Sequence, residues 1–438
     1  LAASQTLEPL YEREGAWAKL VEALETQLTC EIGDEARVEI LSRVGDLHRD
    51  RLHQPAAAND AYARLLQLQP FDESARARLE AVTASTGDWG GLVSLYESLM
   101  SQLNPADSVS CALAVTLGER AAEALDERVG DVDEAIRLHR RVLDVSPARE
   151  ATLVALDALY TRTEAWTDLL GVIEDRLSQT TDASARRALY FQAAAVWEHK
   201  VDAAAEAIAT YRRVLDLVPG DDEALTALDR LYAATGDAAS RAEVIAERVG
   251  QSVQGSSQAL MLKNRLAAVY HDELGDVPQA MALWREVLDD APSNEEARAG
   301  LETQLHGGDF AMDASAVLEP LYVAAGQASS LAALLEIRLQ HTSAPRERLE
   351  LYHRLATLHE RELRAAAASY DVLLRAAEEF LTELSVLDGL TRLAASLERF
   401  AGLCDALEAL ANDASDPQAR RDTLALVARL REDRVGDV

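Results

Sequence analysis

Apolar and polar positions alternate along this chain with the period of an α-helix. In residues 130–147, Ala135, His139 and Val142 lie four and then three residues apart, and Pro147 follows five residues later. Offsets of four and three place side chains on one face of a helix, and proline prevents a helix from continuing. The pattern therefore predicts an amphipathic helix that ends before Pro147.

The same spacing recurs three more times. It is carried by Ala58, Tyr62, Leu65 and Pro70, by Ala207, Tyr211, Val214 and Pro219, and by Ala280, Trp284, Val287 and Pro292. A small alanine lets a neighbouring helix approach closely, and the larger residues fill the space beside it. We expect the four alanines to be buried where two helices cross.

A second helical pattern alternates with the first. Trp17, Trp89 and Trp166 occupy one position of it, and Ala238 and Ala328 occupy that position in two further copies. Each repeating unit thus contains four helices, arranged as two hairpins. A single hairpin of about 35 residues cannot bury its own apolar face, whereas stacked hairpins bury one another's.

A marker position sets the length of the unit. It is occupied by His48, Leu125, Trp197, Tyr270, His359 and Arg431, which lie 77, 72, 73, 89 and 72 residues apart. The longest interval contains an added segment, 311–326, that is long enough for one more helix and resembles residues 3–15. We expect Pro9 and Pro320 to lie in the first turn of their helices or to kink them.

These intervals divide the chain into units of one continuous solenoid. The predicted units are 34–106, 107–181, 182–254, 255–343 with the inserted helix, and 344–415, flanked by the truncated units 1–33 and 416–438. Because the pattern runs through both ends, we expect the 438 residues to be a segment of a larger protein.

The stretch "GDVDEAIRLHRRVLDVSP" (130–147) resembles the second helix of a tetratricopeptide repeat, through its Gly-Asp turn, small alanine and closing proline. The resemblance covers essentially the whole chain, with two departures. Five residues separate Tyr270 from Gly275 where the family has four, and residues 359–378 lack about three turn residues. The resemblance implies an all-α, right-handed α-α superhelical solenoid of about a dozen stacked hairpins that serves as a scaffold for protein–protein interaction.

Charge and cysteine content restrict the class of partner and the cellular compartment that the sequence predicts. The net charge of −32 repels nucleic acid and anionic membranes, and no apolar run is long enough for membrane insertion. Three widely spaced cysteines, Cys30, Cys111 and Cys404, form no disulfide framework, which favours the cytoplasm. Nearly all cations are arginine, as in proteins of GC-rich bacterial genomes. We expect a protein or peptide partner within a larger assembly.

The sequence carries no catalytic motif for nucleotide binding, ester hydrolysis or zinc chemistry, and its nine histidines are scattered. We therefore expect no enzyme activity, no cofactor and no metal site. Two alternatives remain open: a periplasmic scaffold of an envelope export or motility machine, and an interaction module fused to a catalytic domain outside this segment.

Four arginines are the candidate partner-binding residues. Arg43, Arg120, Arg265 and Arg354 stand five residues before the marker, and Gln192 and Leu426 take that position in two other units. Guanidinium groups repeated in this way would bind carboxylates of an extended partner. The alternative is that each arginine neutralises a nearby carboxylate such as Glu39, Glu119 or Glu350.

Overall fold

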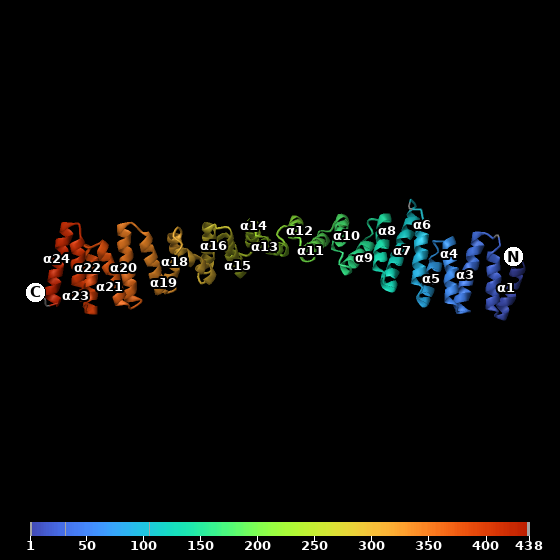
Figure 1. The fold of residues 1–438 in the computed structure, drawn as a ribbon, viewed down its shortest axis with the longest axis horizontal. Helices are drawn as coiled ribbons and strands as arrows, with labels where there is room; N and C mark the ends of the chain where they lie inside the picture. Colours follow the sequence, from blue (N-terminus) through green and yellow to red (C-terminus); the bar gives the residue numbers. More distant parts are fainter. Residues whose placement is uncertain (1, 31, 105, 436–438) are drawn as a thin grey trace. The chain divides into compact units, whose positions relative to one another are not determined.

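The computed structural model describes residues 2–30, 32–104 and 106–435. All regular structure in these ranges is helical, with twenty-four α-helices and three short π-helical segments (Figure 1). The chain divides into two compact units, Leu1–Pro219 and Gly220–Val438, and each is considered by itself. Residues 1 and 436–438, at the outer ends of the predicted units 1–33 and 416–438, lie outside the described residues.

The first compact unit contains twelve of the described α-helices. They are α1 Ala2–Glu14, α2 Trp17–Leu28, α3 Asp34–Asp50, α4 Pro55–Leu68, α5 Glu73–Thr86, α6 Trp89–Gln102, α7 Ser108–Ala124, α8 Val132–Val145, α9 Glu150–Arg162, α10 Trp166–Gln179, α11 Ala183–His199 and α12 Ala204–Leu217. The π-helical segment η1, Leu125–Val129, extends α7.

The second compact unit contains the other twelve. They are α13 Asp222–Thr235, α14 Ala238–Gln251, α15 Ser257–Ala268, α16 Val277–Asp290, α17 Glu295–Leu305, α18 Ala311–Ala324, α19 Ala328–His341, α20 Pro345–Arg361, α21 Ala366–Glu379, α22 Leu384–Leu397, α23 Phe400–Asp413 and α24 Pro417–Leu430. Two π-helical segments, η2 Val269–Glu273 and η3 Arg431–Val435, extend α15 and α24.

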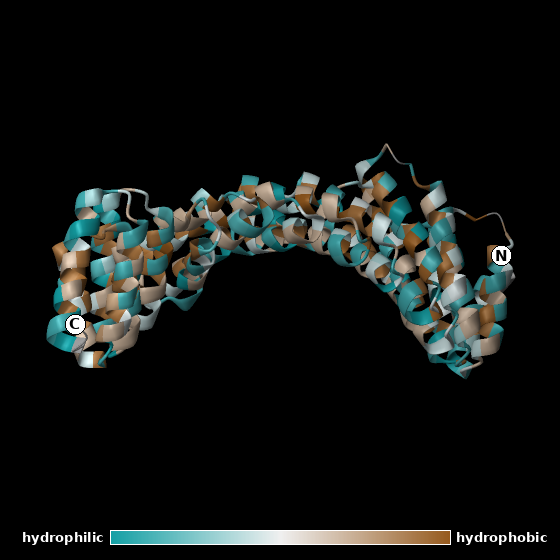
Figure 2. Cartoon of the chain, turned by 60° about the vertical axis from the view of Figure 1, so that its left-hand side comes forward, coloured by the Kyte–Doolittle hydropathy of each residue, from teal (hydrophilic) through white to brown (hydrophobic). Residues whose placement is uncertain are grey.

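Within each compact unit, every helix packs mainly against the helices directly before and after it in the chain. Such nearest-neighbour packing defines a solenoid, because no element needs a partner distant in sequence. Figure 2 shows that the helices carry both apolar and polar residues. The fold is therefore the predicted all-α solenoid of stacked hairpins.

The predicted small positions lie at the helix crossings. Ala58, Ala135, Ala207 and Ala280 are each 0% exposed, as expected. A second small position lies three residues before the marker, on the first helix of the same hairpin. At Gly45, an added Cβ would stand 2.4 Å from Cε1 of Tyr62, so the tyrosine ring lies directly on the glycine backbone. Small residues on both helices allow this close approach.

The tryptophan pattern marks helix starts. Trp17, Trp89 and Trp166 are the first residues of α2, α6 and α10, while Ala238 and Ala328 begin α14 and α19. The prolines of the first pattern each follow a helix end, as in α8, which ends at Val145, two residues before Pro147. Both sequence patterns thus delimit helices correctly.

The first hairpin of each unit closes with a wide turn. The residue five positions after the marker adopts positive φ: it is Gly130, Gly275, His53, Asp202 or Arg364. The next backbone N–H then donates to the marker carbonyl, as from Asp276 to Tyr270 at 2.8 Å and from Ala365 to His359 at 2.8 Å. This six-residue closure explains the spacing of five that departs from the family pattern.

The predicted shortening of residues 359–378 is wrong. Helix α21 begins at Ala366, seven residues after His359, and α16 likewise begins seven residues after Tyr270. The turn is complete, but Arg364 replaces the glycine and Ser369 replaces the small alanine. Ser369 is 0% exposed, and its hydroxyl donates to the carbonyl of Ala356 at 2.8 Å. These two substitutions hid the repeat.

The inserted segment forms a helix of its own, α18, as expected. Pro320 is inside α18 and Pro9 is inside α1, so neither proline lies in a first turn. Because α17 and α18 both resemble first helices of hairpins, two such helices follow one another here. Asn264 of α15 donates to Glu296 of α17 at 3.1 Å, whereas Glu319 of α18 pairs with Arg354 of α20. The first helices of successive hairpins contact one another in order, and at the insertion this order runs from α15 to α17, then to α18, and on to α20.

Candidate functional site

Three of the four candidate arginines pair with a carboxylate of the preceding hairpin. Arg43 Nη1 lies 2.9 Å from Glu8 Oε2, Arg265 Nη2 lies 3.0 Å from Asp229 Oδ2, and Arg354 pairs with Glu319. Gln192, at the same position, donates to Asp157 at 3.0 Å. These carboxylates are not Glu39, Glu119 or Glu350, which the sequence suggested as neutralising groups.

The accepting carboxylates share one position on the first helix of the second hairpin, three residues before Tyr11, Tyr160, Tyr232 or Tyr322. This acidic register consists of Glu8, Glu80 (three residues before Thr83), Asp157, Asp229 and Glu319. Glu302 takes the same position in α17, which is followed by α18 rather than by a second helix; it pairs with Arg298 and accepts from the Tyr322 hydroxyl at 2.7 Å. At four of the five positions of the acidic register a second donor comes from the following helix: Gln27 to Glu8, Arg176 to Asp157 at 2.8 Å, Arg241 to Asp229 at 2.9 Å, and Arg338 to Glu319. Each of these four carboxylates is held between two helices.

The unit that lacks the acid also lacks the arginine. Thr391 occupies the acidic register in α22, and Leu426 occupies the arginine position in α24. Leu426 packs at the edge of the hydrophobic core, and the Thr391 hydroxyl donates to the carbonyl of Leu387. In this unit the acid and its donor are absent together, as expected of a pair that links neighbouring hairpins.

Glu80 is the exception within the acidic register. Among the residues that the structure describes, its carboxylate forms no ion pair and accepts one hydrogen bond, from the Tyr96 hydroxyl at 2.8 Å. The second-helix position that elsewhere supplies Gln27 or Arg176 is Leu99, which is 1% exposed. Burial and the adjacent Glu80 both raise the pKa of Tyr96, so the phenol remains the proton donor.

Arg120, the fourth candidate arginine, is also the least engaged. Its Nη1 lies 3.5 Å from Glu123 Oε2 on the same helix, and its side chain is 57% exposed. Exposed pairs of this kind contribute little to stability. Glu80 and Arg120 occupy corresponding positions of neighbouring hairpins but, among the described residues, form no ion pair with each other. At Glu8, Asp157, Asp229 and Glu319 the carboxylate is held by internal donors.

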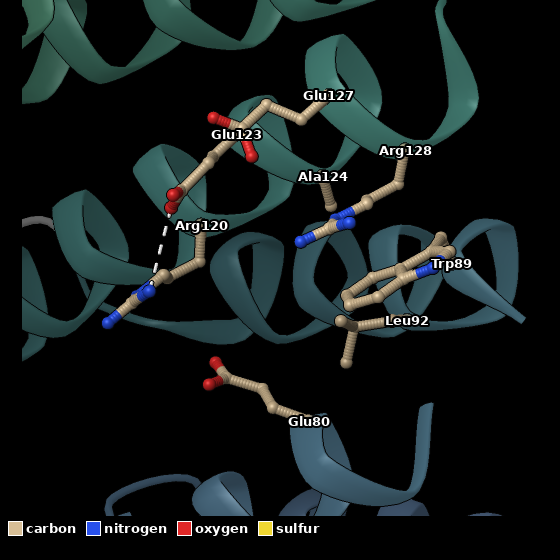
Figure 3. A pocket seen from close by; sticks show the side chains of 8 residues that line it. All are labelled: Glu80, Trp89, Leu92, Arg120, Glu123, Ala124, Glu127 and Arg128. Atoms are coloured by element: carbon tan, nitrogen blue, oxygen red, sulfur yellow. Dashed lines mark ion pairs between the residues drawn. The ribbon is translucent and has the colours of Figure 1, made fainter. Parts of the chain in front are cut away.

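Glu80 and Arg120 line a pocket of about 150 Å³. Its other lining residues are Trp89, Leu92, Glu123, Ala124, Glu127 and Arg128 (Figure 3). In Figure 3, Glu80 comes from a different helix than Arg120 and lies across the opening from it and from Trp89. The Arg128 guanidinium lies 5.5 Å from the Trp89 ring centre, so the indole face is covered by a cation.

The cation over Trp89 belongs to the repeat rather than to this pocket. Arg51 lies 5.0 Å from the Trp17 ring, and Lys200 lies 5.1 Å from the Trp166 ring. All three cations stand three residues after the marker. The feature that distinguishes the Glu80 pocket is therefore its unneutralised carboxylate.

A spacing comparison would have revealed the acidic register. From Glu80 the position recurs at intervals of 77, 72 and 73 residues through Asp157, Asp229 and Glu302, and Thr391 follows after 89 residues, which are the marker intervals. Glu39, Glu119 and Glu350 lie on the same helix as an arginine, whereas the observed partners lie on the preceding hairpin. In the described parts of the chain, no cluster of three or more metal-ligating side chains is present.

The hairpins combine small residues at both helix crossings with a left-handed Gly-Asp turn and antiparallel packing of successive helices. Their fold is that of tetratricopeptide repeats. Neither a protein-family model nor a curated protein matches the sequence. The fold therefore rests on the repeated residues and on the helices that they form.

Solved structures of tetratricopeptide type show a distant likeness. MamA is 18% identical over 41% of this chain and 92% of its own length, with a TM-score of 0.26. YrrB, described as a TPR protein with an unusual peptide-binding site, is 15% identical over 42% and 91%, with a TM-score of 0.26. Yeast Tom70 is 15% identical over 99% and 90%, with a TM-score of 0.21.

The Glu80 pocket of this tetratricopeptide-type solenoid can bind a partner side chain. Glu80 can accept a charge-assisted hydrogen bond, Leu92 offers an apolar contact, and Arg120 can leave Glu123 for another carboxylate. Within the described residues, no helix is both long and apolar enough to cross a bilayer.

Proposed function

We propose that the chain is a non-catalytic interaction scaffold that holds a protein or peptide partner, with the Glu80 pocket as one anchor. The observation that carries the proposal is the contrast within the acidic register. Four carboxylates have two internal donors from neighbouring helices, while Glu80, within the described residues, accepts only from the Tyr96 hydroxyl. A basic or amide side chain of a partner would supply the missing donor.

The charge of the chain agrees with such a partner. At −32 the protein attracts basic segments at long range, and Glu80, half-buried, gives them a specific end point. Arg120 adds a second, opposite charge, which would orient the bound segment. Arg43, Arg265 and Arg354 link hairpins through their carboxylate partners. We propose that they also contact the bound segment.

The proposal includes a cytoplasmic location, because the three cysteines, Cys30, Cys111 and Cys404, are odd in number and too widely spaced in the sequence to suggest a disulfide framework. A periplasmic scaffold role is the alternative, and fusion to a catalytic domain is compatible with either compartment.

Photo-crosslinking in cells tests the proposal. A photoreactive amino acid replaces Glu127, an exposed residue that lines the pocket, and Ala209 on the exposed side of α12 serves as the control position. We expect a discrete protein adduct at 127 that is absent at 209 and that weakens in the Glu80→Gln variant. Equal crosslinking at both positions, or an adduct that is indifferent to Glu80→Gln, would contradict the proposal.

A further inference from the structure

A mainly apolar cavity of the second compact unit lies between α16 and α18. It measures about 860 Å³, whereas the cavity between α4 and α6 measures about 230 Å³. Its lining is mainly apolar: Pro278, Met281, Ala282, Leu288, Pro292, Phe310, Ala316, Val317, Pro320 and Leu321, together with Arg285, Asp289 and Asp313. We call this cavity the α16/α18 groove.

The inserted helix creates the groove. Helix α16 is the second helix of its hairpin, and α18 is an additional helix of the first-helix type. Their facing residues therefore do not have the complementary sizes that repeated pairs have. Met281 and Leu288 are buried in the floor, while Ala282 and Ala316 are exposed on opposite walls. A gap with an apolar floor and small walls remains.

The spacing of the wall residues fits a helical occupant. Along α16 the groove residues Pro278, Met281, Ala282 and Arg285 follow offsets of three and four. Along α18 the offsets are the same, because both walls are helix faces. A groove lined by two helix faces can receive the apolar face of a third helix.

The charged residues at the rim of the groove favour particular side chains on the docked helix. Asp289 and Asp313 are exposed, and neither forms an ion pair among the described residues. Arg285 is the one cation of the lining, so the rim is net acidic. Pro320 has no N–H, and the carbonyl of Ala316 on the same wall therefore lacks its usual intrahelical donor. Carboxylates and a carbonyl together favour lysine or arginine.

We propose that the α16/α18 groove docks one amphipathic α-helix of a partner protein, with its apolar face on Met281 and Leu288 and flanking lysines or arginines on Asp289 and Asp313. This surface is separate from the Glu80 pocket, and the inference goes beyond the function proposed above. It does not depend on Glu80 or on any residue of the arginine register.

The test uses two synthetic helical peptides of about 18 residues, which is five turns. Both carry leucine at positions i, i+3, i+4, i+7 and i+11, and they differ only in flanking lysines or flanking glutamates. Binding to the full chain is measured by fluorescence anisotropy. We expect the lysine peptide to bind at least about 10-fold more tightly than the glutamate peptide, and its affinity to fall with added salt.

Two variants of the chain test whether the peptide binds in the groove. Ala282→Gln with Ala316→Gln lays two long polar side chains over the floor, and Asp289→Lys with Asp313→Lys inverts the rim charge. Each should weaken the lysine peptide at least about 10-fold. Each has a matched control: Ala205→Gln with Ala209→Gln on α12, and Asp133→Lys with Asp144→Lys on α8.

The controls change the same residue types at exposed helical positions outside the groove. Asp144 also occupies the position in α8 that Asp289 occupies in α16, nine residues after the small alanine. Circular dichroism confirms that each variant folds. Equal loss in variants and controls, or equal binding of both peptides, would overturn the proposal.

A second copy of the chain is the remaining occupant to distinguish. If the protein is dimeric in light scattering and Ala282→Gln with Ala316→Gln makes it monomeric, the groove is a self-association surface, and the proposal is wrong. A monomeric protein that binds the lysine peptide through the groove supports it. Glu80→Gln should leave this peptide affinity unchanged, so failure here is separable from failure of the scaffold proposal.

Discussion

The Arg265 guanidinium lies 3.0 Å from the carboxylate of Asp229, a side chain that is 1% exposed. Arg241 holds the other oxygen of the same carboxylate at 2.9 Å. A carboxylate removed from water in this way requires partners, because an unpaired buried charge is costly. The arginine that the sequence offered as a ligand for a partner is thus also part of the joint between two hairpins.

Replacements of Arg265 by glutamine and by leucine should therefore differ in their effect on the free energy of unfolding. Arg265→Gln should cost less than about 1 kcal/mol, since Gln192 serves Asp157 at the same position, whereas Arg265→Leu should cost about 1–3 kcal/mol by leaving Asp229 short of a donor. Thermal melting by circular dichroism compares the two variants. Equal melting of both would show that the hydrogen bond to Asp229 is not needed.

The small alanine of α12 gives a packing test. Ala207 is 0% exposed, so Ala207→Leu should overpack the helix crossing and cost about 1–3 kcal/mol. The exposed Ala209, two residues along the same helix, provides the control Ala209→Leu. Unfolding in urea measures both variants, and a wild-type midpoint for Ala207→Leu would refute the assigned crossing.

His139 predicts a pH dependence of stability. Burial lowers its pKa from the ordinary value of 6.5, with opposing effects from Glu119 and Asp126, and its Nδ1 is buried without a hydrogen-bond partner among the described residues. As pH falls through about 6.5, the unfolded chain takes up a proton that the folded chain resists, so stability falls on acidification.

The variant His139→Phe keeps an aromatic ring and removes that titration. Between about pH 7.5 and 5.5, the melting temperature should therefore fall less for His139→Phe than for the wild-type protein. The difference between the two slopes is the measurement, because carboxylates titrate equally in both proteins. Parallel slopes would mean that His139 is protonated in the folded state.

Much of the fold was predictable because the hydrophobic pattern repeats. The buried alanines, the tryptophans at helix starts and the inserted helix at 311–324 all follow from spacing. The wide turns were less evident, because His53, Asp202 and Arg364 adopt positive φ without being glycine. Asp and His adopt positive φ more readily than most residues, but the preference is too weak to predict a turn, and Arg364 has no such preference.

The site was only partly predictable. The sequence identified the arginine position correctly as a repeated feature but assigned its neutralising carboxylates to the wrong helix. The pairing of Arg43 with Glu8 spans 35 residues, which is one full hairpin. A pair of this kind appears in the sequence only when two registers are compared with each other. The missing ion pair at Glu80 follows from Leu99 at one donor position and from Arg120, at the other, pairing with Glu123 on its own helix.

The acid–arginine pair can be introduced into the repeat unit that lacks both residues. Thr391→Asp and Leu426→Arg would install an acid and an arginine at their register positions in α22 and α24. Each single change places a lone charge at a half-buried position and should destabilise, while the double change should recover about 0.5–1 kcal/mol of coupling. A double-mutant cycle from melting data measures it, and zero coupling would mean that the two positions do not meet.

The central claim is that Glu80 is a binding carboxylate. The measurement that tests it most directly is the affinity of the partner segment crosslinked at position 127, titrated calorimetrically against Glu80→Gln and against Glu73→Gln on the exposed side of the same helix. The account predicts at least about a 10-fold loss for Glu80→Gln, with melting preserved, and no loss for Glu73→Gln. Wild-type affinity for Glu80→Gln would contradict it.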